Sequence, residues 1–186
     1  MRIAVLASGS GTLLDAICGD GIDVALVVVD RDCLAIDVAE KYGVPTVLIE
    51  RIFGRDFDRR GFTERVVDLL RSRDIDLVVM AGWLTIFDQP MFDAFADRIL
   101  NTHPALLPAF PGMHAPRQAL EYGAKVTGCT IHVATPAVDD GPILAQEAVP
   151  IYPGDTEDTL AERIKKVERR LYPDVVRRLM EEDQTS

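Results

Sequence analysis

Short runs of apolar residues alternate with amphipathic segments along the first hundred residues, and this alternation is the feature that most constrains the fold. Residues 3–7 (IAVLA), 24–29 (VALVVV) and 75–82 (IDLVVMAG) are rich in β-branched side chains and contain few polar ones. Strands of this kind are buried on both faces, which is typical of a parallel sheet covered by helices. The three runs therefore predict the inner strands of an α/β domain.

Two amphipathic segments have the periodicity of a helix. Within residues 57–73 apolar side chains recur every three or four positions, and charged side chains occupy the other face. A second apolar stripe runs through residues 160–171, where Thr159 and Glu162 predict a capping box at the start of the helix. The order of elements in the N-terminal half is then β-α-β-α-β-α-β, which predicts a doubly wound sheet with right-handed crossovers.

The C-terminal half has a different strand pattern. Residues 126–134 (VTGCTIHVA) and 143–151 (ILAQEAVPI) alternate in polarity and are joined by the turn-rich segment TPAVDDGP. Such alternation is typical of antiparallel strands. We therefore expect an α/β fold: a single domain over residues 1–186 with a doubly wound, mostly parallel, Rossmann-like sheet and antiparallel strands in the C-terminal half. The N-terminal half extends to about residue 100.

Charge, hydropathy and cysteine usage exclude several classes of protein. The net charge of -10 argues against a nucleic-acid partner, because phosphate backbones bind basic faces. No apolar run approaches the roughly 18 residues that span a bilayer, and no signal peptide is evident, so we expect no membrane partner. Cys18, Cys33 and Cys129 are odd in number and widely spaced, which argues against disulfides and a zinc site and predicts a protein of the reducing cytoplasm. No cluster has metal-ligand spacing, so no metal is expected.

A glycine-rich segment, ASGSGTLLDAI, follows the first predicted strand and leads into a helix. The start of a helix presents free backbone N–H groups and the positive end of the helix dipole, which together bind anions. Gly9 and Gly11 allow a close approach of the backbone, and the hydroxyls of Ser8, Ser10 and Thr12 can donate further hydrogen bonds. The segment predicts a phosphate site.

The spacing of the glycines does not match a dinucleotide fingerprint. After Gly9 and Gly11 the third glycine of that motif would stand at position 14, where this chain has Leu14. Asp30, at the end of the second predicted strand, resembles the acid that binds a ribose, but a single acid at a strand end is weak evidence. We favour a site for a monophosphate, and a tight strand-to-helix turn without a ligand is the alternative.

An Asn and a His lie two positions apart in NTHPALLPAFPG, residues 101–112. Residues i and i+2 of a strand share a face, so Asn101 and His103 would project together from residues 99–103 while Thr102 points away. Pro104 holds His103 in an extended conformation. An amide donor beside an imidazole suits acyl transfer, because both groups can stabilise an oxyanion and the imidazole can also move a proton.

A histidine in this role needs an orienting carboxylate, and the candidates are Asp139 and Asp140 in the turn before Gly141. Their spacing does not distinguish them. His132 alternates within a predicted strand, which favours a structural role, and the role of His114 stays open. On local sequence alone, a capped strand end with a surface histidine is an equal alternative. The chain has no GxSxG motif and no reactive-cysteine context, so serine-hydrolase chemistry is a poor match.

With both motifs in place, the chain resembles the phosphoribosylglycinamide formyltransferases, the folate-dependent glycinamide ribonucleotide transformylases of purine synthesis. The resemblance extends from IAVLASGSGTLL to GDTEDTLAERIKKVERRLYP, and NTHPALLPAFPG and VDDGPILAQ are its most specific parts. A tRNA formyltransferase would carry a further C-terminal domain, and a formyltetrahydrofolate deformylase usually carries an extra N-terminal one. Neither fits within this chain.

The resemblance implies transfer of a formyl group from 10-formyltetrahydrofolate, as cosubstrate, to the amine of 5-phosphoribosylglycinamide. The small-molecule substrates are then the partners, no cofactor is tightly bound, and a homodimer is one candidate assembly. Asn101, His103 and Asp139 match the catalytic trio, Asp139 being the Asp of the family's Asp-x-Gly-Pro pattern. A deformylase with the same trio, and an oxidoreductase or sensor that uses only the glycine-rich loop, are the alternative functions.

The resemblance also implies two sets of binding residues. The ribonucleotide set is Gly11, Thr12, Leu13, Lys165, Lys166, Val167 and Glu168. The folate set is Arg60, Leu84, Thr85, Ile86, Phe87, Asn101, Thr135, Pro136, Ala137 and Val138. Two positions depart from the family, since many relatives have Asn at the position of Leu13 and some have Arg at that of Thr85. For Arg60, Lys165 and Glu168 the alternative is that each is a solvated charge on the exposed face of a helix.

Overall fold

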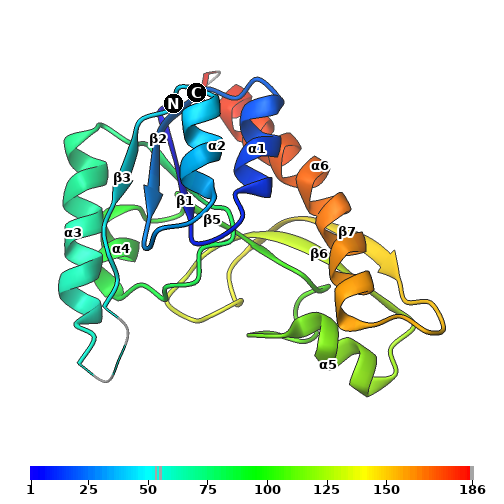
Figure 1. Cartoon of the computed structure of the whole chain (residues 1–186). Coiled ribbons are helices and arrows are strands. Elements are labelled where there is room, and N and C mark those ends of the chain that lie inside the picture. The colour runs from blue at the N-terminus through cyan, green and yellow to red at the C-terminus, as the bar shows by residue number, and fades with distance from the viewer. Residues whose placement is uncertain (53, 55, 185–186) are drawn as a thin grey trace.

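The computed structural model describes residues 1–52, 54 and 56–184, and within them one sheet of seven strands is flanked by helices (Figure 1). The strands are β1 (Ile3–Ala7), β2 (Val24–Val29), β3 (Thr46–Leu48), β4 (Leu77–Met80), β5 (Ile99–His103), β6 (Val126–Val133) and β7 (Ile143–Pro150). The helices are α1 (Thr12–Gly19), α2 (Ala35–Lys41), α3 (Arg59–Ser72), α4 (Gln89–Ala94), α5 (Ala115–Tyr122) and α6 (Glu157–Gln184). The strand order is β3-β2-β1-β4-β5-β6-β7. β1 to β5 are parallel and β6 and β7 are antiparallel, which confirms the predicted fold class.

Helices cover both faces of the parallel strands, and each face has its own core. In β1, Ile3, Val5 and Ala7 pack toward α1, α2 and α6, whereas Ala4 and Leu6 pack toward α3 and α4. The side chains of all five residues are fully buried. The continuous apolar run therefore reflects burial on two faces, as the sequence predicts.

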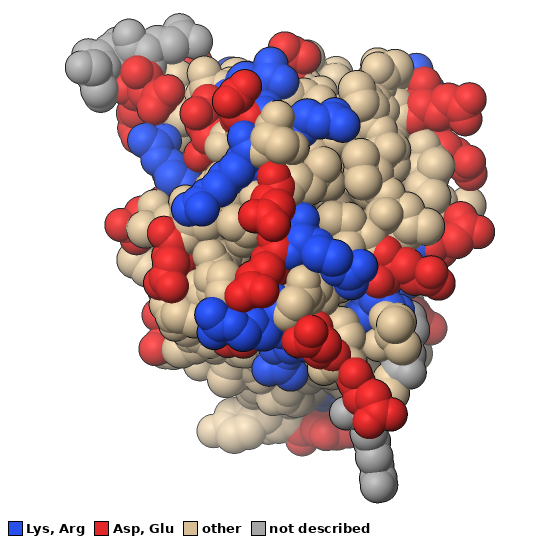
Figure 2. All heavy atoms as spheres, turned by 90° about the vertical axis from the view of Figure 1, so that its left-hand side faces the viewer, with Lys and Arg blue, Asp and Glu red and all other residues tan. Residues whose placement is uncertain are grey.

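α3 occupies the amphipathic segment predicted between residues 57 and 73. Its side chains Phe62, Val66 and Leu70 are buried in the second core, and the Asp58 carboxylate caps the helix by accepting from the Gly61 N–H at 2.9 Å. Acidic and basic side chains are interspersed over the face of the molecule on which α3 lies (Figure 2). The helical periodicity thus indicated correctly which side of the segment is buried.

α6 begins about one turn before the predicted capping box, so that prediction was wrong in position. The Thr156 N–H donates to Oγ1 of Thr159 at 2.9 Å, and the Thr159 N–H donates to Oγ1 of Thr156 at 3.2 Å. Glu162 instead pairs with Lys165 at 2.7 Å, one turn along the helix. A threonine hydroxyl can accept as well as a carboxylate can, so Thr159 takes the place that the prediction assigned to Glu162.

The glycine-rich loop is joined to the segment that follows β4. The Ser8 N–H donates to the Gly82 carbonyl at 3.2 Å, and the Leu84 N–H donates to Oγ of Ser8 at 3.0 Å. β1 and β4 are neighbours whose following helices pack on opposite faces of the sheet, which is where ligands bind in folds of this kind. The two segments predicted to bind substrates therefore meet at the carboxyl edge of the sheet.

Candidate active site

β5 spans the predicted residues and presents Asn101 and His103 from one face. Nδ2 of Asn101 lies 3.2 Å from Nε2 of His132 on β6. Thr102 projects from the other face, where its hydroxyl donates to Oε1 of Glu168 on α6 at 2.8 Å. Strand alternation thus places the amide and the imidazole side by side, as the spacing predicts.

Both ring nitrogens of His103 face oxygen acceptors. Nδ1 lies 3.2 Å from Oδ2 of Asp139, and Nε2 lies 2.8 Å from the carbonyl of Phe110. The ring is almost fully buried, at 4% exposed. Each ring nitrogen therefore has an oxygen to which an N–H can donate.

The structure distinguishes between the two candidate carboxylates. The side chain of Asp139 is 6% exposed and lies against His103, whereas Asp140 is exposed. Oδ2 of Asp139 also accepts from the Gly112 N–H at 2.8 Å, so the carboxylate links the loop after β5 to the loop after β6. Asp139 is thereby held in the position of an orienting carboxylate.

The loop that carries Asp139 is held close to β6. The Val133 N–H donates to the Pro142 carbonyl at 2.9 Å, and a Cβ added to Gly141 would overlap the Val133 carbonyl. Asp139 itself has φ of 57°, in the left-handed region that Asp tolerates better than most residues. The Asp-x-Gly-Pro pattern therefore has a structural reason, since only glycine allows this approach of the two backbones.

His132 contacts the trio, which the sequence prediction of a structural role did not anticipate. Its Nδ1 donates to the Val133 carbonyl at 3.0 Å, and its Nε2 lies near Asn101 and 3.7 Å from Oδ1 of Asp139. Burial lowers the pKa of His132 below its usual value, which favours the neutral ring. The alternation of residues 126–134 carried a signal, because it places His132 on one face of a strand that pairs with β5. His114 lies outside this group, exposed and 3.5 Å from Oε1 of Glu157.

The glycine-rich loop ends at Gly11, which precedes α1 without a side-chain cap. Gly11 has φ of 70°, and a Cβ at this position would lie 2.8 Å from Cα of Ala35 on α2. Ser10 and Thr12 are exposed, with their hydroxyl oxygens 3.4 Å apart. Leu13 is 5% exposed and packs into the core, so it can offer an anion only its backbone N–H.

The segment of α6 from Lys165 to Glu168 is divided between solvent and core. Nζ of Lys165 is bonded to Glu162, Lys166 is exposed, and Val167 packs against the core. Burial raises the pKa of Glu168 above its usual value, although Thr102 donates to it. Glu168 thus lies on the opposite face of β5 from Asn101 and His103.

The segment from Leu84 to Phe87 alternates between solvent and core. Leu84 is 62% exposed and Ile86 is 50% exposed, so both present apolar surface to a ligand. Phe87 is buried, with its ring 5.4 Å from that of Trp83, and it belongs to the core. Thr85 is buried too, so of the four residues in this segment of the predicted folate set only Leu84 and Ile86 offer side chains at the surface.

Asp30 and Thr85 form a polar contact inside the protein. The Thr85 hydroxyl donates to Oδ2 of Asp30 at 2.6 Å, and Nε of Arg31 donates to Oδ1 at 2.8 Å. Burial by itself would raise the pKa of Asp30, but hydrogen bonds from Arg31, Thr85 and Ser8 outweigh it and lower that pKa. Because the Asp30 carboxylate already accepts these hydrogen bonds, it is not available to a ribose. This agrees with the weak sequence evidence for Asp30 as a ribose ligand.

Apart from Asn101, the remaining residues of the predicted folate set lie on α3 and in the loop after β6. Arg60 is exposed on α3 and pairs with Glu64 one turn later at 3.0 Å, as a solvated helix charge does. In the loop after β6, the Thr135 hydroxyl donates to the Ala137 carbonyl at 3.0 Å, and residues 136–138 are exposed. This is the loop that carries Asp139, so those residues border the trio.

Among the described residues, no group of three or more His, Cys, Asp or Glu is arranged to hold a metal ion. Within the same part of the chain, no helix is both long enough and apolar enough to cross a membrane.

Sheet and site together define a doubly wound α/β protein with an amide, an imidazole and a carboxylate gathered where β5 ends. Comparison with known proteins assigns the family: residues 1–176 match the model described as Formyl transferase, and the chain belongs to this formyl transferase family. The membership confirms the resemblance drawn from NTHPALLPAFPG and VDDGPILAQ.

The similar proteins carry consistent names. A curated relative, the phosphoribosylglycinamide formyltransferase of Mycobacterium tuberculosis H37Rv, is 45% identical over 175 residues, covering 91% of this chain and 80% of that protein. The structure is similar to that of glycinamide ribonucleotide transformylase 1 from Symbiobacterium toebii, with a TM-score of 0.88 and 44% identity over 95% of this chain and 86% of that one. It is also similar to phosphoribosylglycinamide formyltransferase from Streptococcus pneumoniae TIGR4, with a TM-score of 0.89 and 36% identity over 96% and 98% of the two chains.

Proposed function

We propose that the chain transfers the formyl group of 10-formyltetrahydrofolate to the primary amine of 5-phosphoribosylglycinamide, in de novo purine biosynthesis. The products are formylglycinamide ribonucleotide and tetrahydrofolate, so the folate is a cosubstrate consumed in each turnover. The observation that carries the proposal is the shared face of Asn101 and His103, with Asp139 3.2 Å behind the imidazole. A relative named phosphoribosylglycinamide formyltransferase is 45% identical over 91% of the chain.

Asn101 and His103 stabilise the oxyanion. The amine attacks the formyl carbon, and the formyl oxygen gains negative charge in the tetrahedral intermediate. Asn101 directs one N–H of its Nδ2 toward His132 and has a second N–H for this oxygen. The formyl oxygen replaces the Phe110 carbonyl as the acceptor of the His103 Nε2 proton. Loss of one such donor typically raises the barrier by about 2.7–4 kcal/mol.

His103, oriented by Asp139, transfers the protons of the reaction. The attacking amine loses a proton, and the departing N10 of the folate gains one, so the net proton balance is zero. Asp139 holds Nδ1 of His103 and stabilises the imidazolium, which leaves Nε2 to exchange the proton with the reacting atoms. Holding the amine and the formyl carbon at attack distance contributes much of the remaining rate gain.

The substrates occupy two segments at the carboxyl edge of the sheet. The backbone N–H groups of Gly11 to Leu13 bind the phosphate of the ribonucleotide, and the α6 segment from Lys165 to Glu168 borders the rest of this substrate. Leu84 and Ile86, which are exposed, pack against the folate together with the loop over residues 135–138.

Residues 1–186 form one formyltransferase domain, with a phosphate-binding half up to about residue 100 and a folate-binding and catalytic half after it. The enzyme acts in the cytoplasm, where the free Cys18, Cys33 and Cys129 stay reduced. The assembly is a monomer or a homodimer, and light scattering of the purified chain distinguishes the two.

The test is an absorbance assay of the conversion of 10-formyltetrahydrofolate to tetrahydrofolate, with and without 5-phosphoribosylglycinamide. Conversion that depends on the ribonucleotide supports the proposal. Conversion at the same rate without it means hydrolysis, and the chain would then be a deformylase. No conversion by folded protein in either mixture overturns the assignment of acyl transfer to Asn101 and His103.

A further inference from the structure

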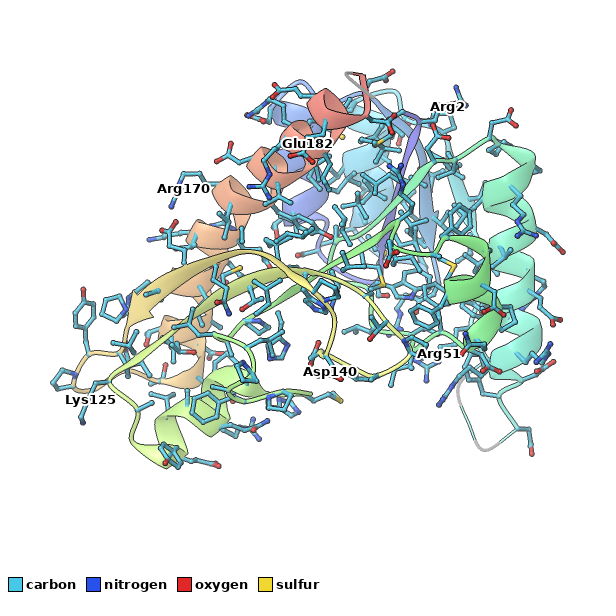
Figure 3. All side chains as sticks on the ribbon, turned by 180° about the vertical axis from the view of Figure 1, so that it is seen from behind. Arg2, Arg51, Lys125, Asp140, Arg170 and Glu182 are labelled. Carbon is cyan, nitrogen blue, oxygen red and sulfur yellow. The ribbon has the colours of Figure 1, made fainter. Side chains whose placement is uncertain are left out.

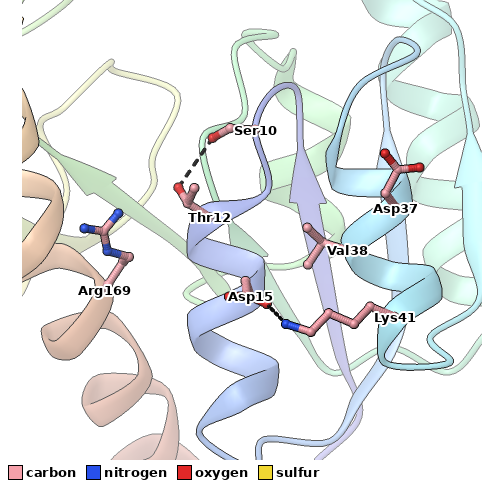
Figure 4. A pocket seen from close by; sticks show the side chains of 7 residues that line it. All are labelled: Ser10, Thr12, Asp15, Asp37, Val38, Lys41 and Arg169. Atoms are coloured by element: carbon pink, nitrogen blue, oxygen red, sulfur yellow. Dashed lines mark hydrogen bonds and ion pairs between the residues drawn. The ribbon is translucent and has the colours of Figure 1, made fainter.

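A cleft of about 550 Å³ lies between α1, α2 and α6, directly beside the glycine-rich loop. In Figure 4, Arg169 stands on α6 beside the first turn of α1, and Asp37 and Val38 lie on the other side, on α2. The lining residues are Ser10, Thr12, Asp15, Asp37, Val38, Lys41 and Arg169. Neither the sequence motifs nor the resemblance singled out Arg169.

The charges in this cleft are unevenly distributed. Nζ of Lys41 is bonded to Oδ1 of Asp15 at 2.6 Å, so these two charges neutralise each other. Asp37 repels anions from the α2 side. Arg169 lies on the α6 side, where its charge attracts the carboxylates of Glu162 and Glu168, and within the described chain its guanidinium makes no hydrogen bond or close ion pair. An anion in the cleft is therefore drawn toward the side formed by Arg169 and Thr12.

The glycine-rich loop lacks a charged group of its own. Its side chains at the cleft are the neutral hydroxyls of Ser10 and Thr12, and Leu13 is buried in the core. Backbone N–H groups and a helix dipole supply only partial charges, roughly half an elementary charge for the whole helix terminus. A full positive charge would add to these partial charges, and of the two cations that line the cleft Arg169 is the one not held in a close ion pair.

We propose that Arg169 binds the phosphate of the ribonucleotide substrate from the α6 side, opposite the backbone N–H groups of the glycine-rich loop. The inference rests on the proposed function, because that function supplies the phosphate. A guanidinium suits this task, since it can donate two parallel hydrogen bonds to phosphate oxygens. Arg169 is thus a binding residue that leaves the chemistry at Asn101 and His103 unchanged.

The experiment compares Arg169→Gln with Arg170→Gln, its neighbour on the same helix. Arg170 points outward from α6 and pairs with Glu147 on β7, away from the cleft (Figure 3). For Arg169→Gln we expect the KM for the ribonucleotide to rise about ten- to hundredfold, because loss of hydrogen bonds to a charged group weakens binding by about this factor. The KM for the folate and kcat should change less than about threefold, since the contact is equal in ground and transition states. Arg169→Lys should recover part of the loss, and Arg170→Gln should match the wild type.

Two further measurements separate this inference from the proposed function. Inorganic phosphate should inhibit the wild type competitively against the ribonucleotide, and its inhibition constant should rise by a similar factor in Arg169→Gln. A KM for the ribonucleotide within twofold of the wild type, or an equal rise in both KM values, overturns the role of Arg169. If the wild type shows no ribonucleotide-dependent turnover, the proposed function fails, and calorimetric titration of both proteins with inorganic phosphate still decides whether Arg169 binds this anion.

Discussion

Asn101 and His132 face each other across the antiparallel pair of β5 and β6, with Nδ2 of Asn101 3.2 Å from Nε2 of His132. Nδ1 of His132 donates to the Val133 carbonyl, so the neutral ring, which burial favours, has an acceptor at Nε2. The amide of Asn101 must therefore turn its nitrogen toward His132. This contact determines the orientation of the group proposed to stabilise the oxyanion.

Removal of His132 should impair Asn101 indirectly. In His132→Ala the amide of Asn101 loses the partner that orients it, so we expect kcat to fall about 10–100-fold with little change in either KM. His132→Gln, which offers a carbonyl acceptor, should recover part of the loss. Steady-state kinetics measures both variants, with His114→Ala as the control, because His114 is exposed and lies outside the trio. If His132→Ala abolished turnover and His132→Gln restored none of the lost kcat, the orienting role of His132 would be contradicted.

His103 should be essential for turnover and dispensable for folding. Proton transfer by a positioned side chain contributes about 10²–10⁴-fold, so His103→Ala should lower kcat within this range. Thermal unfolding followed by circular dichroism checks that the variant keeps its fold. Near-normal turnover of a folded His103→Ala protein would remove the residue from the mechanism.

Asp139 and Asp140 form a matched pair for testing the orienting carboxylate. Asp139 is buried against His103 and Asp140 is exposed, so the same substitution probes two different environments. We expect Asp139→Asn to lower kcat about 10–100-fold, as loss of a hydrogen-bonded supporting carboxylate does, and Asp140→Asn to leave it within about twofold. Equal effects in the two variants would mean that the position of Asp139 in the structure has no catalytic consequence.

Glu168 should couple stability to pH. Because burial raises its pKa, the folded protein holds this proton to a higher pH than the unfolded chain does. Its contribution to the free energy of unfolding is therefore lost as pH rises from its ordinary value of 4.5 through the folded pKa. Glu168→Gln removes the titration, so we expect its Tm, relative to that of the wild type, to increase from pH 5 to pH 8. Thermal unfolding at the two values measures this, and a Tm difference that does not change with pH would refute it.

Gly11 and Gly9 should respond differently to the same methyl group. A Cβ at Gly11 would lie 2.8 Å from Cα of Ala35 in a left-handed conformation, whereas a Cβ at Gly9 has nothing within 4 Å. Gly11→Ala should therefore lower the free energy of unfolding by about 1–3 kcal/mol and raise the KM for the ribonucleotide. Gly9→Ala, measured by the same chemical denaturation, should resemble the wild type in stability. If both variants were destabilised equally, the close approach of Gly11 to α2 would not be the reason that this position needs glycine.

The sequence by itself determined the elements whose signals are local. Continuous apolar runs identified the parallel strands because burial on two faces leaves no polar side. Helical spacing identified the buried side of α3, and the two-residue alternation placed Asn101 and His103 on one face of β5. The Gly-rich loop was recognised in the same way, from neighbouring residues, whereas the Asp-x-Gly-Pro pattern came from the family resemblance.

Only the tertiary structure decided what depends on distant segments. The pairing of β5 with β6 brings His132 to Asn101, and the approach of the loop after β6 brings Asp139, which the resemblance had already favoured over Asp140, to His103. The packing of α1 against the sheet turns the side chain of Leu13 inward, and the packing of α6 beside α1 brings Arg169 to the cleft. Local spacing cannot supply these relationships, because the register between strands and the direction in which a helix faces arise from packing across the whole domain.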